Sequence, residues 1–268
     1  WTFDANLSTN TNKIKKLYSG RDQIIEGDGI AGSTNTLLRP GLSADTYYLR
    51  EWAGVDPDTG APQWLTTDAN GDRVITKNYA KADQVALDKR ATPNVFGSFS
   101  TTLMYKGFDL NAVFGYSLGA YIYNYSRQEY DSDGAYTDRN QFSLQKGWKR
   151  WKQKGDIATH PVAAYNNPSN ANKASTRYLE SADFLKLRSV TLGYNFNLKS
   201  QIVKALRVYV SGENLFCITD YSGVDPELPA ADGGRDASGE RSTALSISTG
   251  AGVYPSVRKF MLGVNVTF

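Results

Sequence analysis

The sequence predicts an all-β protein, and three observations lead to that prediction. The 268 residues include 17 Tyr, 11 Phe and 5 Trp, which favour pleated strands, and 24 Gly, which supply turns. The last ten residues alternate strictly between large apolar side chains and small or polar ones. No run approaches the roughly 18 consecutive apolar residues of a transmembrane helix. The terminal strand must therefore bury its apolar face against another layer of protein or against lipid. That face carries Phe260, Leu262, Val264, Val266 and Phe268.

A similar alternation opens the chain at residues 1–9, where Trp1, Phe3 and Leu7 share one side and polar residues share the other. The chain has no initiator Met and begins inside this strand pattern. We interpret it as the C-terminal piece of a longer chain.

Four more strands follow from the same pattern. Residues 94–118 predict a hairpin with a tight turn at Lys106-Gly107, since both halves alternate in phase on either side of it. Residues 184–198 alternate too, but Leu185 and Leu187 are out of phase with the rest of that stretch. This predicts a β-bulge near Arg188-Ser189. A further strand runs from Leu206 to about Phe216.

Between these strands, three long segments lack alternation and are rich in turn residues: 10–93, 119–183 and 218–257. The connections thus alternate between long and short. This is typical of bacterial outer-membrane barrels, whose long loops are extracellular and whose short turns are periplasmic. Six passes that begin upward leave the C-terminus in the periplasm. Six strands cannot close a barrel, because the smallest have eight, so we expect further strands upstream.

Charge and composition argue against several other classes. The net charge is +3, with basic and acidic residues mixed along the chain, so nothing indicates nucleic-acid binding. Cys217 is the only cysteine, which rules out an intrachain disulfide. A single His, His160, and a single Cys argue against a zinc site. No catalytic residues, metal or cofactor are predicted, because no nucleophile motif accompanies His160 and no phosphate-binding loop is present.

Two acidic turns have to be weighed against calcium binding. Asp56-Pro57-Asp58-Thr59-Gly60 is interpreted as a proline-directed turn capped by Asp, and the segment 223–227 echoes it. Asp131, Asp133 and Asp138 lie close together, but Phe142 stands where an EF-hand needs Glu. We therefore favour turn chemistry over calcium at both places.

The loop aromatics are the candidate ligand contacts, because sugar rings stack on aromatic side chains. The alternatives are that they pack the long loops together or lie in the aromatic girdle at the membrane interface. The candidates are Tyr47, Trp52, Trp64, Trp148 and Trp151. On the polar face of the strands, Asp109, Arg207 and Glu213 either line a water-filled lumen or form an internal salt-bridge network against a domain that plugs the barrel.

Four stretches resemble the C-terminal region of the SusC/RagA family of TonB-dependent outer-membrane transporters. They are residues 51–60, 92–110, 184–194 and 206–216, the last extended by the segments 221–227 and 254–256. Together they span nearly the whole chain in the family's order.

The resemblance implies a 22-stranded transmembrane barrel with an N-terminal plug, of which residues 1–268 form the last part. It implies active uptake of oligosaccharides, or sometimes peptides, across the outer membrane of a Gram-negative bacterium. It also implies a SusD-like surface lipoprotein as partner and energy from the TonB-ExbB-ExbD system. Phe268 resembles the terminal signal read by the outer-membrane assembly machinery.

Two other classes remain open. A soluble β-sandwich carbohydrate-binding module would explain the aromatics, but it requires the apolar faces to cover one another. A passive porin-type barrel would share the strands and loops, and it would lack a plug and a TonB box. A requirement for detergent separates the first class from a barrel, and the upstream sequence separates the second from a transporter.

Overall fold

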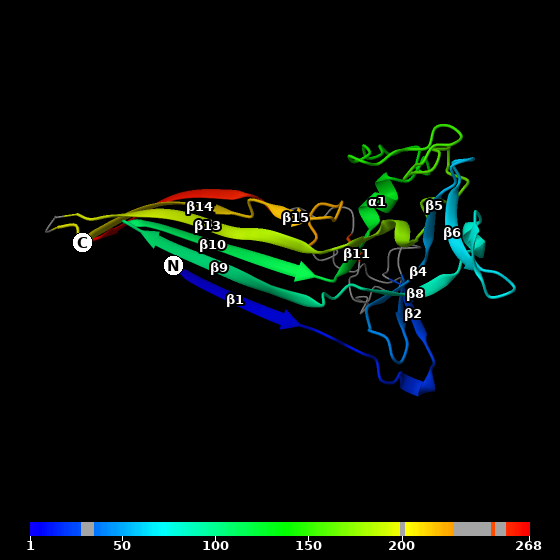
Figure 1. Cartoon of the computed structure of the whole chain (residues 1–268), viewed down its shortest axis with the longest axis horizontal. Helices are drawn as coiled ribbons and strands as arrows, with labels where there is room; N and C mark the ends of the chain where they lie inside the picture. Colours follow the sequence, from blue (N-terminus) through cyan, green and yellow to red (C-terminus); the bar gives the residue numbers. More distant parts are fainter. Residues whose placement is uncertain (28–34, 199–201, 228–247, 250–255) are drawn as a thin grey trace.

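The computed structural model describes residues 1–27, 35–198, 202–227, 248–249 and 256–268. Six long strands form one antiparallel sheet in the order β1-β9-β10-β13-β14-β17, and a short strand, β15, pairs with the end of β13 (Figure 1). Their bounds are Thr2–Thr9 (β1), Val95–Tyr105 (β9), Phe108–Leu118 (β10), Phe184–Phe196 (β13), Ala205–Glu213 (β14), Cys217–Thr219 (β15) and Lys259–Thr267 (β17). The six predicted strands are confirmed.

The β9–β10 turn and both chain ends lie at one end of this sheet, and the described parts of the long loops lie at the other (Figure 1). The β9–β10 turn has two residues with positive φ, Lys106 at 47° and Gly107 at 89°, as a two-residue hairpin of right-handed twist requires. β14 ends at Glu213 rather than at the predicted Phe216, because Asn214 turns the chain with a φ of 53°. The predicted alternation of long and short connections is confirmed.

The predicted bulge lies at Arg188. Val113 of β10 pairs with Ser189, and the next residue, Phe114, pairs with Leu187, so Arg188 is the extra residue on β13. The bulge brings Leu185 and Leu187 onto the same face as Val190 and Leu192, because it shifts the side-chain phase by one. The out-of-phase leucines in the sequence are therefore explained.

Opposite residues in the sheet show that it has two chemically distinct faces. One row across all six strands consists of Thr2, Thr102, Asn111, Thr191, Ser211 and Met261. The adjacent row consists of Leu103, Leu110, Leu192, Val210 and Leu262. Directly paired residues point to the same side of a sheet, so the strands combine their alternations into one polar and one apolar face.

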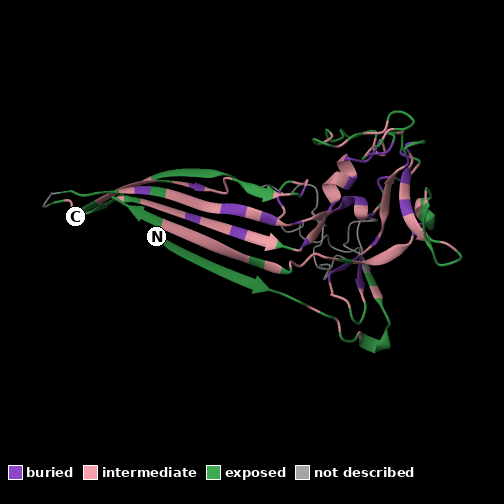
Figure 2. Ribbon diagram, viewed as in Figure 1, coloured by how far each residue is buried: buried purple, intermediate pink, exposed green. Residues whose placement is uncertain are grey.

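The edge strands β1 and β17 are exposed along most of their length, whereas the inner strands are mostly half-buried (Figure 2). On the inner strands, the apolar face is exposed at residues such as Leu103 and Leu192, while Ala112 and Leu187 on the same face are buried. The terminal strand shows the exposure most clearly, with Phe260, Leu262, Val264, Val266 and Phe268 between 43% and 76% exposed. A soluble protein rarely leaves so large a contiguous apolar surface uncovered. This exposure is what a lipid-facing surface requires, and the lipid contact itself stays a prediction.

The long loops fold into a lobe at one end of the sheet. One small sheet contains β2 (Ile24–Gly27), β3 (Asn35–Leu38), β4 (Thr46–Arg50) and β8 (Gln84–Arg90), and a second contains β5 (Trp52–Val55), β6 (Pro62–Thr67) and β7 (Arg73–Thr76). A third contains β11 (Tyr121–Asn124), β12 (Leu179–Ser181) and β16 (Ser248–Thr249). The helical turns are η1 (Tyr18–Gly20), η2 (Tyr79–Lys81), α1 (Tyr125–Tyr130) and η3 (Thr176–Tyr178).

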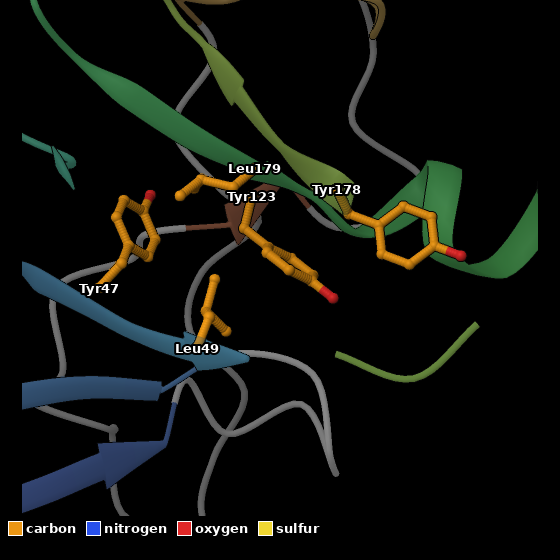
Figure 3. Close-up of a cluster of buried hydrophobic side chains, with 5 residues drawn as sticks. All are labelled: Tyr47, Leu49, Tyr123, Tyr178 and Leu179. Atoms are coloured by element: carbon orange, nitrogen blue, oxygen red, sulfur yellow. The ribbon is translucent and has the colours of Figure 1, made fainter. Parts of the chain in front are cut away.

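The lobe has its own hydrophobic core, formed by Tyr47, Leu49, Tyr123, Tyr178 and Leu179 (Figure 3). The Tyr47 hydroxyl donates a 2.9 Å hydrogen bond to the carbonyl of Tyr121, so the first and second long loops are joined through the core. The third long loop, 218–257, lies largely outside the described residues, as does most of the 254–256 segment. Within the described part of the chain, no helix is long and apolar enough to cross a bilayer.

Candidate functional site

The hairpin β5–β6 places two of the candidate aromatics and ends in the Asp56–Gly60 turn. The turn is closed by a 2.8 Å hydrogen bond from the Gly60 amide to the Asp56 carbonyl. The Asp56 carboxylate accepts from the Asp58 amide at 2.9 Å and from the Thr59 hydroxyl at 2.7 Å. Lys77 also forms an ion pair with this carboxylate. This geometry is the Asp-capped turn that the sequence favours over a calcium site.

The second long loop docks onto that turn through Trp151. The Trp151 indole Nε1 donates to the Pro57 carbonyl at 2.9 Å, and the amide of Gly155 donates to the same carbonyl at 2.8 Å. The amide of Val162 donates to the Gly60 carbonyl at 3.0 Å. The Trp151 ring lies directly over Gly60, where an added Cβ would come 2.4 Å from the indole Cε3. The absence of a side chain at Gly60 therefore makes this docking possible.

Substituting Gly60 by Ala should undock the second loop. The residue has a φ of +70°, which costs an L-residue about 1 kcal/mol, and the new methyl group would also collide with Trp151. We expect faster hydrogen exchange at the amides of Gly155 and Val162, with a total cost of about 2 kcal/mol. The matched control is Gly71→Ala, because Gly71 has a φ of +90° and nothing within 4 Å of its Cβ position. Equal exchange in both variants would contradict the docking role of Trp151.

A buried ionic cluster holds the second loop from the inside. The Asp133 carboxylate is fully buried between Arg177, which pairs with one oxygen, and Arg150, whose Nη1 lies 2.5 Å from the other. The neighbouring Asp131 lies 2.7 Å from His160 Nε2 and also faces Arg127. Both oxygens of Asp133 pair with Arg side chains, and Asp131 Oδ2 contacts His160 and Arg127. Asp131 Oδ1 is buried without a hydrogen-bond partner among the described residues and lies 3.9 Å from Arg150 Nη2. The described residues contain no cluster of three or more His, Cys, Asp or Glu side chains suited to a metal.

The electrostatics of the cluster favour charged carboxylates. Burial raises the pKa of Asp131, but the hydrogen bond to His160 and the charges of Arg177 and Arg127 outweigh it, so the pKa lies below its usual value. His160 itself has no exposed surface, and its other ring nitrogen, Nδ1, lies 2.8 Å from the Thr159 hydroxyl. It is therefore positioned as a packed structural histidine, without access for a substrate.

Two of the candidate aromatics, Trp148 and Trp52, contact this cluster. The Trp148 ring lies 4.3 Å from the Arg127 guanidinium carbon and 5.0 Å from the His160 ring, and the Trp52 ring lies 5.1 Å from that of Arg177. Tyr47 and Trp64 have no exposed surface, which matches the packing alternative and leaves them nothing to offer a ligand. Trp52, Trp148 and Trp151 are half-buried, and for them the ligand-binding role stays a prediction.

The polar face of the sheet brings together the charged residues that the sequence placed there. Arg207 pairs with Asp109 through two hydrogen bonds, 3.0 Å at Nε and 2.5 Å at Nη2, although the two residues lie on strands separated by β13. Gly193 of β13 lies beneath this pair, since an added Cβ would come 2.6 Å from Arg207 Nη2. Glu213 pairs with Lys259 at 3.3 Å. All three side chains thus form salt bridges within the sheet.

A second group of ion pairs on the polar face, which joins β13 to the segment 223–227, was not predicted from the sequence. Lys186, buried on the polar face of β13, donates to Asp225 at 2.9 Å and to Glu227 at 3.1 Å, and Arg188 also pairs with Glu227. The segment 223–227, whose acidic residues looked like simple turn chemistry, is thereby tied to the sheet. The sequence contains the two basic residues of the strand, Lys186 and Arg188, and the two acidic residues of the loop. Their spacing along the chain does not indicate that they form ion pairs.

The sheet has one apolar and one polar face, and a folded loop lobe lies at one end of it. These features define a segment of a transmembrane-type β-barrel. Comparison with known proteins identifies which barrel it resembles. No family model matches the chain. TonB-dependent receptor P3 of Formosa agariphila is 29% identical over the whole chain, and TonB-dependent receptor SusC of Bacteroides thetaiotaomicron is 26% identical, also over the whole chain.

Solved structures agree with these relatives. The RagAB peptide transporter matches 99% of this chain with a TM-score of 0.77 and 25% identity, and the closed-closed state of the RagAB importer matches with a TM-score of 0.75. The resemblance to the SusC/RagA family of TonB-dependent receptors is confirmed. This chain spans about a quarter of the length of the relatives that it matches, 27% of receptor P3 and 24% of SusC.

Proposed function

We propose that this chain is the C-terminal part of the barrel of a TonB-dependent transporter that takes up oligosaccharides or peptides across the outer membrane. The observation that carries the proposal is the match of sheet and lobe together to the RagAB peptide transporter over 99% of the chain. The exposed apolar face supports a position in lipid, and the lobe supports a role in capturing cargo at the outer surface.

The proposed partners follow from the same relatives. SusC and RagAB support a SusD-like surface lipoprotein over the loop lobe and energy from the TonB system. Trp52, Trp148 and Trp151 are the proposed aromatic contacts for cargo, since each is only half-buried in the lobe. The assembly role of Phe268 is part of the same proposal.

Uptake by the complete receptor tests the transport function. Cells that carry the complete receptor and its lipoprotein gene would be given fluorescent oligosaccharides and peptides. We expect saturable uptake that stops when TonB is deleted or the proton gradient is dissipated. Uptake that continues without TonB would instead indicate a passive pore. A complete protein that stays monomeric and folded without detergent would contradict both types of barrel.

A further inference from the structure

A cavity of about 730 Å³ lies where the loop lobe meets the main sheet. Its walls come from the segment after β1, from residues 39–46, from β8, and from the ends of β9 and β10. Asn94 and Gly119, which belong to this lining, continue the polar side-chain phase of β9 and β10. The cavity therefore lies at the end of the polar face of the sheet, and its volume falls in the range of ligand pockets.

The lining carries a clear excess of positive charge. It includes four basic side chains, Lys13, Arg39, Lys89 and Arg90, and one acidic side chain, Asp88. The four basic side chains and the one acidic side chain give the lining a formal net charge of +3, which equals the formal net charge of the entire chain. A concave, low-dielectric site with one sign of charge concentrates the opposite charge.

These cations have no carboxylate partner within the described residues. Lys89 lies over the Tyr121 ring, 4.8 Å from its centroid. Arg90 donates only to uncharged oxygens, those of Asn94 and of the Asn10 backbone. Lys13 and Arg39 are exposed and form no ion pair with any described residue. Elsewhere in the lobe, arginines such as Arg127 and Arg150 are paired with acids.

The wall behind the cations is held rigidly by a buried carboxylate. Asp45 has no exposed surface and accepts hydrogen bonds from Ser43, from Asn12 at 3.4 Å and from the Thr92 amide at 2.6 Å. Asn12 Oδ1 in turn accepts from the Ala44 amide at 2.8 Å. Because Asp45 is saturated by these neutral donors, it positions Asn12 and Ser43 without forming an ion pair with the cavity cations.

We propose that this cavity binds the carboxylate of an acidic saccharide. The unpaired cations supply the charge, and the amide of Asn94 and the hydroxyl of Thr11 suit sugar hydroxyls. Binding itself does not depend on the proposed uptake. The further consequence, that the receptor selects acidic cargo, rests on the proposed transport function.

The test measures binding to the complete receptor in detergent by ligand-observed NMR. Glucuronate is the probe and glucose the neutral control, since they differ only at the carboxylate, and inorganic phosphate probes the anion site alone. We expect glucuronate and phosphate to bind, and their affinity to fall as salt is added. Glucose should bind at least tenfold more weakly than glucuronate. The double variant Lys13→Gln with Arg39→Gln should lose about tenfold in affinity, because two exposed charge contacts disappear.

The matched control is Lys15→Gln with Lys16→Gln, which removes the same charge from exposed lysines outside the cavity. Unchanged affinity in the control and lost affinity in the cavity variant support the site. Equal loss in both variants, or equal binding of glucose and glucuronate, would overturn it. Displacement of glucuronate by lipopolysaccharide nanodiscs would assign the cavity to a lipid headgroup and would also overturn the saccharide proposal. Because no transport is measured, a failed uptake experiment leaves this result unaffected.

Discussion

Replacement of Leu192 by Arg should destabilise the assembled barrel by about 2–4 kcal/mol, whereas the same replacement at the preceding residue, Thr191, should cost less than about 1 kcal/mol. Leu192 lies in the apolar row between Leu110 and Val210 and is 46% exposed. In the proposed barrel, an Arg there would meet the hydrocarbon core of the bilayer. Thr191 lies in the polar row between Asn111 and Ser211, where a charge meets the barrel interior.

The measurement is the denaturant midpoint of the complete receptor in lipid vesicles, with the amount assembled in the outer membrane as a second readout. Val264→Arg on β17 should behave like Leu192→Arg if it also lies near mid-bilayer, because Val264 is 58% exposed on the same face. Asn265 is a poorer control than Thr191, since it pairs with Arg207 and an Arg there would meet a like charge. Similar costs at positions 191 and 192 would refute the assignment of the apolar face to lipid.

The second large effect is expected at the buried ionic cluster of the lobe. Replacing Arg177 by Met should cost about 3–5 kcal/mol, because the carboxylates of Asp131 and Asp133 would remain buried with fewer opposite charges. The Arg177 side chain is only 1% exposed, so water cannot substitute for it. We expect the lobe to open locally while the barrel strands stay protected, as measured by hydrogen exchange in residues 119–183.

The matched control is Arg73→Met. Arg73 pairs with Glu51, but both side chains are at least one-third exposed, so its loss should cost no more than about 1 kcal/mol. An Arg177→Met lobe that exchanges at the wild-type rate would refute the stabilising role of the cluster.

Because of the same cluster, the stability of the lobe should depend on pH and should fall in acid. The pKa of Asp131 is lowered in the folded protein, so its stabilising contribution is complete above the usual Asp pKa of about 4 and disappears as the pH falls through the lowered value. Hydrogen exchange in the lobe should therefore accelerate, relative to its intrinsic rate, only in acid below about pH 4. Acceleration between neutral and mildly alkaline pH would not come from this carboxylate.

The amino-acid sequence alone was sufficient to predict the six long strands, their two faces, a bulge near Arg188-Ser189 and the alternation of long and short connections. Each of these depends on local periodicity, because a strand exposed to lipid on one side must alternate at every second residue. The Asp56–Gly60 turn was predictable for the same reason, since Asp, Pro and Gly fix their own backbone within five residues.

The organisation of the loops could be seen only in the folded chain. The lobe strands are short, mostly four to seven residues, and are stabilised by contacts between segments far apart in the chain. Asp131 and Asp133 looked like an incomplete calcium loop, and only folding brings Arg177, more than forty residues away, into contact with them. Tyr47 and Trp64 looked like candidate ligand contacts, but their burial depends on partners that spacing does not reveal. The basic cavity likewise combines residues from five separate segments, so no local pattern could have predicted it.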